Sequence, residues 1–434
     1  MTNSSTVPDP ADPVFISYRQ KDGTDVAAEL AWLFRAAGIP VWRDRDDLPP
    51  GDTEARLKQA IAAGISGGVL VTTPDVENSR VVKTLEAPRL IELHDKYEVF
   101  ALGIANSVKT KDGGTDYGAP DRLLELRPGT LIGVDQHSAE RDGLLVLIRG
   151  LVWHRIASLR ERIQDTDQTF HLSLQTRNTP QVYDRTGDEL DIRLRPSGHE
   201  RLPSAEGLRD LKDTVGFLPD AVTRSGAHRL RVRGGAHLSV AFAVGAALPS
   251  SRIGHMDVID QQGITWASDG EAQFTAQPQV QVADEGSNPS AITAGRPSVA
   301  MYVDLLPQRS DTAFARYVED NSPFLVAWRH LRSVTGELLD PSNAGLIAAD
   351  IAAHIRALSN ESSNAEVHLL LRCPFPLALL IGRLTNTLRF VVHEWDDSEP
   401  TERDDYRARY VPTLRVRASA SAGAIEEVLV PERS

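Results

Sequence analysis

The sequence predicts an α/β protein with more than one domain, and three observations support this prediction. The chain has 434 residues, more than one hydrophobic core usually holds. In its first third, short apolar runs alternate with segments of helical periodicity, as in a doubly wound parallel sheet. Beyond a polar stretch at 164–170, a strand–turn–helix–strand order occurs twice.

The first third contains five apolar runs that predict the strands of one parallel sheet. Between them, apolar residues recur at helical spacing, and Gly38 supplies a stop signal for the first helix. We expect Ser79 to cap a later helix that continues to about Leu93 despite Pro88. The predicted strands are 14–18, 39–42, 68–73, 99–104 and 130–134, and a long helix is predicted at 140–163.

The pattern changes after residue 170. Strands are predicted at 171–174 and 190–194, as a hairpin that turns at Thr186–Gly187. A cluster of Gly, Ser, Asn and Pro at 285–297 predicts a long loop between strands. Further strands are predicted at 230–235 and 367–372, each followed by a strongly apolar helix, at 238–248 and from 375 to about 384.

These last two units are interpreted as an internal repeat. Residues 230–260 align without gaps on 367–397, at an offset of 137 residues. Apolar positions largely coincide, and the shared strand–turn–helix–strand order supports the repeat more strongly than the identities do. The identical pairs are Ala241/Ala378, Gly245/Gly382, Arg252/Arg389 and Asp260/Asp397.

Composition excludes several classes of protein. The chain has 60 acidic and 47 basic residues and a net charge of −13, which argues against a partner of duplex nucleic acid. This net charge does not exclude one local pocket that binds a small anion. There is no charged-then-apolar leader and no apolar run of about eighteen residues, so we expect a cytoplasmic protein without membrane contact.

Other catalytic arrangements find little support in the sequence. A Walker phosphate loop, a G-x-S-x-G elbow and an H-E-x-x-H pair are all absent, and we expect no metal and no cofactor. The single cysteine, Cys373, excludes a disulfide framework and is interpreted as a buried thiol.

The N-terminal third resembles a TIR domain, of the Toll/interleukin-1 receptor family, over roughly residues 12–155. The resemblance rests on the strand VFISYRQKD, the strand IPVWRD, the loop DRDDLPPGD at the position of that family's BB loop, and the helix SRVVKTLE. It implies a flavodoxin-like fold with ligands at the carboxyl ends of the strands. Catalytic TIR domains cleave NAD+ between nicotinamide and ribose, so the resemblance implies a NAD+ glycohydrolase.

The TIR resemblance also assigns roles to residues. Glu86 occupies the position of the catalytic carboxylate, whereas Val82 stands where some members have a tryptophan. A carboxylate beside the ribose would stabilise the positive charge that grows there as nicotinamide leaves. Substrate NAD+ contacts are expected from Tyr18, Arg19, Asp46 and Ser79, and contacts between TIR domains from the loop residues Asp46, Asp47 and Leu48.

The C-terminal part resembles a SAVED domain, a sensor of cyclic-oligonucleotide (CBASS) antiphage defence built from two fused CARF-like, Rossmann-like units. The segments LRVRGGAHLSVAFAVGAAL, VHLLLRCPFPLALLIG, VVHEWDD and RYVPTLRV carry this resemblance. A glycine turn that opens a helix lets backbone N–H groups approach a phosphate, and a tryptophan can stack on a base. The expected ligand contacts are Gly234, Gly235, His237, Arg372 and Trp395, with Arg233 and Ser239 as further donors.

The two resemblances together predict domains and a mechanism. We expect a disordered N-terminus at 1–11, a TIR domain at 12–160, a linker at 161–170, and a SAVED domain at 171–434 with halves at about 171–300 and 301–434. Binding of a cyclic oligonucleotide would drive association into a homo-oligomer or filament and activate NAD+ hydrolysis. The ligand that we expect is a cyclic trinucleotide such as cyclic tri-adenylate. The alternative is a non-catalytic TIR scaffold assembled by nucleotide binding.

Overall fold

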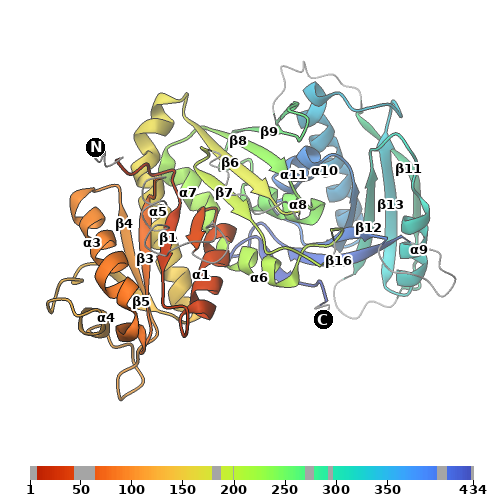
Figure 1. Ribbon diagram of the computed structural model, residues 1–434. Coiled ribbons are helices and arrows are strands. Elements are labelled where there is room, and N and C mark those ends of the chain that lie inside the picture. The colour runs from red at the N-terminus through yellow and green to blue at the C-terminus, as the bar shows by residue number, and fades with distance from the viewer. Residues whose placement is uncertain are drawn as a thin grey trace. The chain divides into compact units, whose positions relative to one another are not determined.

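The computed structural model describes residues 7–43, 64–177, 187–198, 200–268, 278–291, 297–397 and 408–431. Contacts divide the chain into two units, each of which is described by itself. Unit 1 comprises residues 1–173, 179–193 and 220–227, and unit 2 comprises residues 174–178, 194–219 and 228–434. Figure 1 gives the labels of the helices and strands.

Elements up to residue 175 alternate between strands and helices, as the sequence predicts. They are β1 (Val14–Ser17), α1 (Thr24–Ala36), β2 (Val41–Arg43), β3 (Gly67–Thr72), η1 (Val76–Asn78), the π-helix η2 (Val82–Glu86), α3 (Ala87–Lys96), β4 (Ala101–Asn106), α4 (Ala119–Leu123), β5 (Asp135–Ser138), α5 (Arg141–Asp165) and β6 (Thr169–Gln175).

The remaining elements run from residue 190 to residue 428. They are β7 (Leu190–Arg193), α6 (Ala205–Thr214), α7 (Phe217–Ser225), β8 (Arg229–Gly235), α8 (Leu238–Ala247), β9 (His255–Ile259), β10 (Thr265–Ala267), β11 (Val280–Ser287), β12 (Ser298–Asp304), α9 (Thr312–Asn321), β13 (Leu325–Ser333), η3 (Pro341–Asn343), α10 (Ala344–Glu361), β14 (Glu366–Arg372), α11 (Phe375–Gly382), β15 (Phe390–Asp396), β16 (Arg409–Val416) and β17 (Ile425–Val428).

The first sheet has the strand order β2-β1-β3-β4-β5, and every neighbouring pair is parallel, which confirms the predicted flavodoxin-like sheet. Glycines let helices approach it closely. A Cβ on Gly68 would meet Leu90 of α3, and one on Gly103 would meet Leu147 of α5. Gly68 pairs with Leu102, next to Gly103, so the two glycines face opposite sides. Helices α3 and α5 therefore cover opposite faces of the sheet (Figure 1).

The fifth strand differs from the prediction. The apolar run at 130–134 is a turn, and β5 begins directly after it at Asp135. Leu131 of the run is buried in the core from this turn. Among the described residues, strand β5 pairs with β4 and forms the edge of the sheet, so its residues need not be apolar.

The segment expected to be disordered, 1–11, is described from Val7 onward, and its last residues are anchored. The buried guanidinium of Arg155, in α5, donates to the backbone carbonyls of Pro10, Ala11 and Asp12 at 2.6–2.8 Å. These bonds satisfy a charged group that burial would otherwise penalise, and they hold this part of the segment in place. The expected linker at 161–170 contains the end of α5 and the start of β6.

The other two sheets share one topology. Their orders are β10-β9-β8-β6-β7 and β11-β13-β12-β14-β15-β16-β17. With the added strands β11 and β17 set aside, each has the order 2-1-3-4-5 in its own chain sequence. The first sheet has this order as well, and it is the doubly wound order of flavodoxin-like folds. This agreement confirms the predicted pair of fused units. The loop predicted at 285–297 begins later, because β11 continues to Ser287 in antiparallel pairing with β13.

The contacts between the helices α8 and α11 in unit 2 follow the internal repeat position by position. A Cβ on Gly245 of α8 would collide with the carbonyl oxygen of Leu379 in α11, and one on Gly382 of α11 with the carbonyl oxygen of Phe242 in α8. Both pairs of positions differ by the offset of 137 that the sequence predicts. The two helices, side by side in Figure 1, therefore contact each other through equivalent backbone positions.

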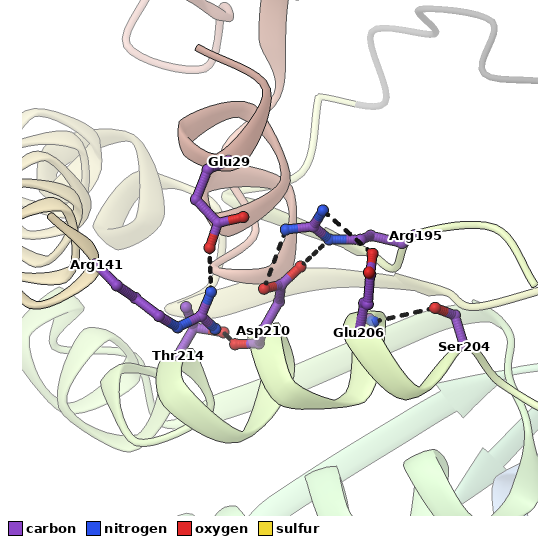
Figure 2. Close-up of polar contacts among 8 residues, drawn as sticks. Glu29, Arg141, Arg195, Ser204, Glu206, Asp210 and Thr214 are labelled. Carbon is purple, nitrogen blue, oxygen red and sulfur yellow. Dashed lines mark hydrogen bonds and ion pairs between the residues drawn. The ribbon is translucent and has the colours of Figure 1, made fainter. Parts of the chain in front are cut away.

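Charged side chains fix individual helices within each unit (Figure 2). In unit 2, Ser204 caps α6 by accepting from the N–H of Gly207 at 3.2 Å, and Arg195 donates to Asp210 at 2.6 Å. In unit 1, Arg141 of α5 forms an ion pair with Glu29 of α1. No helix in the described ranges is long and apolar enough to cross a membrane.

Candidate functional site

Glu86 lies at the end of a π-helical turn, η2, in unit 1. The amide of Ala87 donates to the carbonyl of Val82, five residues earlier, which is the π spacing. Pro88 explains this wider turn, because a proline has no N–H and would collide with the carbonyl four residues before it in an α-helix. The prediction that the helix continues past Pro88 is confirmed. Turns of this kind occur frequently at functional sites.

The Glu86 carboxylate is buried against the end of β1. Ser17, the last residue of β1, donates from its hydroxyl to Glu86 Oε2 at 2.6 Å. Ser17 and Glu86 are 1% and 6% exposed, so this bond is shielded from water. Glu86 therefore stands at the carboxyl edge of the sheet, which is the ligand-binding edge of doubly wound folds.

Tyr18 and Arg19 continue the chain from β1 at the same edge. Tyr18 is buried. Nη1 of Arg19 lies 3.2 Å from a carboxylate oxygen of Asp22 and 3.2 Å from one of Asp75. These two acids balance the arginine's charge, and the expected NAD+ contacts of Tyr18 and Arg19 stay predictions.

The residues before Glu86 support its turn. Ser79 Oγ accepts from the N–H of Val82 at 3.4 Å, which confirms the predicted cap. Val82 is 3% exposed in the core of unit 1, so an aliphatic side chain packs where some TIR domains have a tryptophan. Asp46, Asp47 and Leu48, expected at the NAD+ site and the assembly loop, lie outside the described residues.

Sequence reasoning missed two threonine hydroxyls at the end of β3. Thr72 and Thr73 are 1% and 2% exposed, and their Oγ1 atoms have no hydrogen-bond partner among the described residues. Unpaired buried hydroxyls are rare, since each costs free energy, and they call for a bound water or ligand. Two threonines that follow an apolar strand give no such signal in a sequence.

Unit 2 contains a cavity of about 630 Å³ at the carboxyl ends of its strands. The lining comes from both halves of the repeat, and it includes the equivalent positions Ala236/Cys373 and Leu238/Phe375. The residues that line the cavity are Arg177, Gly234, Gly235, Ala236, Leu238, Asp260, Gln261, Gln262, Ile264, Trp266, Leu305, Leu306, Pro307, Leu338, Leu339, Pro341, Cys373, Pro374, Phe375 and Pro376.

The N-termini of two helices meet at this cavity. Helix α8 begins at Leu238 and α11 begins at Phe375, and both residues line the cavity. The first amides of a helix carry partial positive charge, so the arrangement favours an anionic ligand. Gly234 has a φ of +129° and lies against the carbonyl of Leu174, where a side chain would not fit. The structure thus places the predicted residues Gly234 and Gly235 in the cavity wall.

Arg177 is a cavity residue that sequence reasoning missed. It follows β6, is exposed, and forms no hydrogen bond or ion pair with the described residues. The other charged lining residue, Asp260, is already bonded, because its carboxylate accepts from the N–H groups of Gln262, Ile264 and Trp266. Arg177 is therefore the cation that an anionic ligand would meet in this part of the chain.

His237 lies beside the cavity and serves the structure of its wall. Its Nδ1 is 2.9 Å from Thr176 Oγ1 and its Nε2 is 3.2 Å from the carbonyl of Glu200. Burial, helped by the nearby charge of Arg177, lowers the pKa of His237 to about 4. The ring is therefore neutral at physiological pH. His237 is also not among the residues that line the cavity.

An internal carboxylate already occupies the first turn of α8. Oε1 of Glu394, from β15, accepts from the N–H of Ser239 at 2.6 Å, so a ligand phosphate does not find this donor free. The Ser239 hydroxyl is buried without a partner among the described residues. Burial raises the pKa of Glu394 to about 7, against the lowering effects of its bond to the Ser239 amide and of the nearby charge of Arg177. Glu394 is thus an ionisable group directly behind the cavity wall.

Arg372 and Trp395 do not line the cavity. Arg372 donates to Asp304 Oδ1 at 2.6 Å and to the carbonyl of Gln308 at 2.5 Å, and so holds the loop that follows β12. The Trp395 ring lies under the Arg201 guanidinium, 5.3 Å from the ring centroid. Cys373 lines the cavity as a buried thiol, and burial raises its pKa to about 12.

One group of side chains in unit 2 has the composition of a metal site. Ligand atoms of Asp304, Asp311 and His330 all lie within 4.8 Å of one another. However, Arg332 Nη1 lies 2.5 Å from Asp304 and 4.0 Å from Asp311. The positive charge of the Arg332 guanidinium thus lies where a metal ion would have to bind these carboxylates, and we assign no metal to them.

Comparisons with known proteins give one family match in the N-terminal part of the chain and one in the C-terminal part. The family model of the TIR domain matches residues 14–99, and that of SAVED, "SMODS-associated and fused to various effectors sensor domain", matches residues 212–416. Among solved structures, the Acinetobacter baumannii Cap4 SAVED/CARF-domain containing receptor with the cyclic trinucleotide 3'3'3'-cAAA is similar at 10% identity and a TM-score of 0.43, with 91% of this chain and 99% of that chain covered. The Moraxella osloensis Cap4 receptor is similar at 13% identity and a TM-score of 0.39, with 91% and 98% covered. No curated protein matches this chain.

The two family matches fall on the two regions that hold the candidate sites. The first covers the strand that ends in Ser17 and the turn that ends in Glu86. The second covers α8, α11 and most of the cavity wall. The chain is therefore similar to the TIR family in its N-terminal part and to the SAVED sensor family in its C-terminal part.

Proposed function

We propose that this chain is an antiphage effector in which a cyclic oligonucleotide, bound by the SAVED domain, activates NAD+ hydrolysis by the TIR domain. The observation that carries the enzymatic part is the buried Glu86 carboxylate, held by Ser17 at the carboxyl edge of the TIR sheet. The observation that carries the sensory part is the cavity of unit 2, with two helix N-termini and Arg177 in its wall.

The proposed reaction breaks the bond between the ribose C1′ of NAD+ and the ring nitrogen of nicotinamide. Nicotinamide leaves with the bonding electron pair, water adds hydroxide to C1′, and one proton is released together with ADP-ribose. Positive charge develops on the ribose as the bond breaks, as in glycoside cleavage. A fixed carboxylate in a site shielded from water stabilises this charge strongly, which is the role proposed for Glu86.

The cavity of unit 2 suits a small cyclic nucleotide better than a long nucleic acid. The N-terminus of α11 and Arg177 would hold phosphates, since Glu394 already accepts from the first turn of α8, and the exposed apolar residues would contact bases. Leu338, Ile264 and Leu306 in the lining are 84%, 41% and 36% exposed, so their side chains are accessible to the base of a ligand. The ligands to test are cyclic trinucleotides, beginning with cyclic tri-adenylate.

Association of several chains completes the proposal. The TIR resemblance assigns the segment at 46–48 to contacts between TIR domains. Ligand binding would then favour an assembled state in which the NAD+ sites are active, so the enzyme is silent before infection. A closed ring and an open filament both satisfy this scheme, and the mass of the assembly distinguishes them.

The direct test combines the purified full chain with NAD+ and cyclic di-, tri- or tetranucleotides, and measures nicotinamide by chromatography and mass by light scattering. We expect nicotinamide release with one class of ligand and an increase in mass with that same ligand. Ligand-dependent assembly without nicotinamide release would contradict the enzymatic proposal and favour a scaffold. Release from a protein that stays monomeric would contradict activation by assembly.

Arg177→Ala is expected to weaken ligand binding about tenfold, because the cavity loses its free cation. Isothermal titration with the activating nucleotide measures the change. Arg316→Ala is the matched control, since Arg316 is an exposed arginine of α9 whose partner, Asp320, is also exposed. Equal affinities of the two variants would remove Arg177 from the proposed site.

Ligand affinity is expected to fall several-fold between pH 6 and pH 8. Glu394, whose pKa burial raises to about 7, gains negative charge in this interval and repels an anionic ligand. The pKa of His237 is about 4 and that of the Cys373 thiol about 12, so neither neighbour titrates in the same interval.

Glu394→Gln should therefore bind the ligand equally well at pH 6 and pH 8. The same titration on Glu366→Gln serves as the control, since Glu366 lies at the amino end of β14, away from the cavity. A pH dependence that persists in Glu394→Gln would show that another group causes it.

A further inference from the structure

A buried side-chain bond between Ser17 and Glu86 joins the π turn to the sheet. Ser17 Oγ and Glu86 Oε2 are 2.6 Å apart, within the short range of hydroxyl–carboxylate bonds. Both residues are buried, at 1% and 6% exposure. Burial makes the bond stronger than the same contact in water, and it makes a lost donor expensive.

The donor comes from a rigid position. Strand β1 pairs with β2 on one side and with β3 on the other, and Ser17 itself is in register with Leu70 of β3. The acceptor, in contrast, ends a flexible side chain on the π turn η2 that precedes Pro88. The helix therefore brings Glu86 to the edge of the sheet, and the strand fixes the direction of its carboxylate.

We propose that Ser17 is a positioning residue for the catalytic carboxylate, which it orients and keeps ionised. This inference rests on the proposed function of Glu86. A hydroxyl donor favours the charged form of a carboxylate, whereas burial favours the neutral form. Because only the charged form stabilises a developing cation, loss of the donor would lower the rate of bond cleavage more than NAD+ binding.

The chain offers a closely matched control. Ser66 is also buried, at 7% exposure, and its hydroxyl donates to the carbonyl of Asp12 at 2.6 Å. It precedes β3 and so lies at the amino edge of the same parallel sheet, opposite Ser17. Ser66→Ala and Ser17→Ala remove the same atom and a bond of the same length from opposite edges.

The experiment activates the full chain with cyclic tri-adenylate and measures kcat, KM, the pH–rate profile and the unfolding temperature of each variant. In Ser17→Ala we expect kcat to fall about 10- to 100-fold with little change in KM, and the acid limb to move up by about one pH unit. Ser17→Thr, which keeps a hydroxyl, should recover most of the rate. Ser66→Ala should lose similar stability without either kinetic change. Kinetics of Ser17→Ala like those of Ser66→Ala would overturn the inference.

A second measurement separates this inference from the proposed function. Carbon-13 NMR of labelled glutamate follows the titration of Glu86, whose signal is identified by its loss in Glu86→Gln. We expect the titration midpoint to rise by about one pH unit in Ser17→Ala, whether or not the wild-type chain releases nicotinamide. An unchanged midpoint would refute the role of Ser17. A raised midpoint in a chain that cleaves no NAD+ would refute the proposed reaction and leave the control of the Glu86 charge by Ser17 established.

Discussion

Glu86→Gln is expected to lower kcat for nicotinamide release by about 10²- to 10³-fold or more in the ligand-activated protein. The substitution keeps the size of the side chain and a group that can accept from Ser17, but removes the negative charge next to the ribose. Electrostatic stabilisation of a developing charge is commonly the largest single contribution to catalysis in a shielded site. Nicotinamide release and ligand binding should be measured on the same samples, and binding should be unchanged.

The matched control is Glu92→Gln, because Glu92 lies in α3, the helix that directly follows the π turn. Glu92 is exposed and pairs with Arg89, so its charge does not face the edge of the sheet. It should retain full activity. A Glu86→Gln protein with the activity of Glu92→Gln would show that another group supplies the charge, or that cleavage needs none.

Gly245→Ala is expected to destabilise the SAVED domain by about 3 kcal/mol or more, the largest effect on stability that we expect. Its new methyl group would collide with the Leu379 carbonyl oxygen, and a backbone atom in a packed helix cannot move aside alone. The unfolding temperature should fall by about 5–10 °C. Gly254→Ala is the control, because no atom lies within 4 Å of the added carbon there.

The double variant of Gly245 and Gly382 tests the symmetry of the contact. One outward displacement of α8 from α11 makes room for both methyl groups, since each glycine meets the backbone of the other helix. The combined loss of stability should therefore be clearly smaller than the sum of the two single losses. Strict additivity would indicate that the two contacts are independent.

Much of the fold was predictable because apolar periodicity reports burial directly. The strands of the first sheet that are buried on both faces, β3 above all, stand out as apolar runs. Strand β5 does not, because an edge strand with polar residues resembles a turn, and the apolar run before it is a turn that packs into the core. The repeat was visible through Gly245 and Gly382, whose identity is required by the backbone that each one faces.

The candidate sites were predictable only in part, because a sequence shows neighbours along the chain and not across it. The Gly234–Gly235 turn is a local signal in the sequence, and both glycines line the cavity, while their contact with a ligand stays a prediction. His237 looks like a donor for a ligand, yet its ring contacts Thr176, which lies far away in the sequence. The backbone N–H of Ser239 is likewise bonded to the distant Glu394. Arg177 carries no motif at all, and only the fold brings it to the cavity.

The contact between α8 and α11 has a consequence for how the sensor measures its signal. Two halves that joined as separate chains would form their cavity only above a threshold concentration of protein. Here both halves belong to one chain, and their helices are locked at Gly245 and Gly382. The described cavity wall is complete in every copy, however few copies the cell holds, so the proposed ligand can bind without two chains first having to meet.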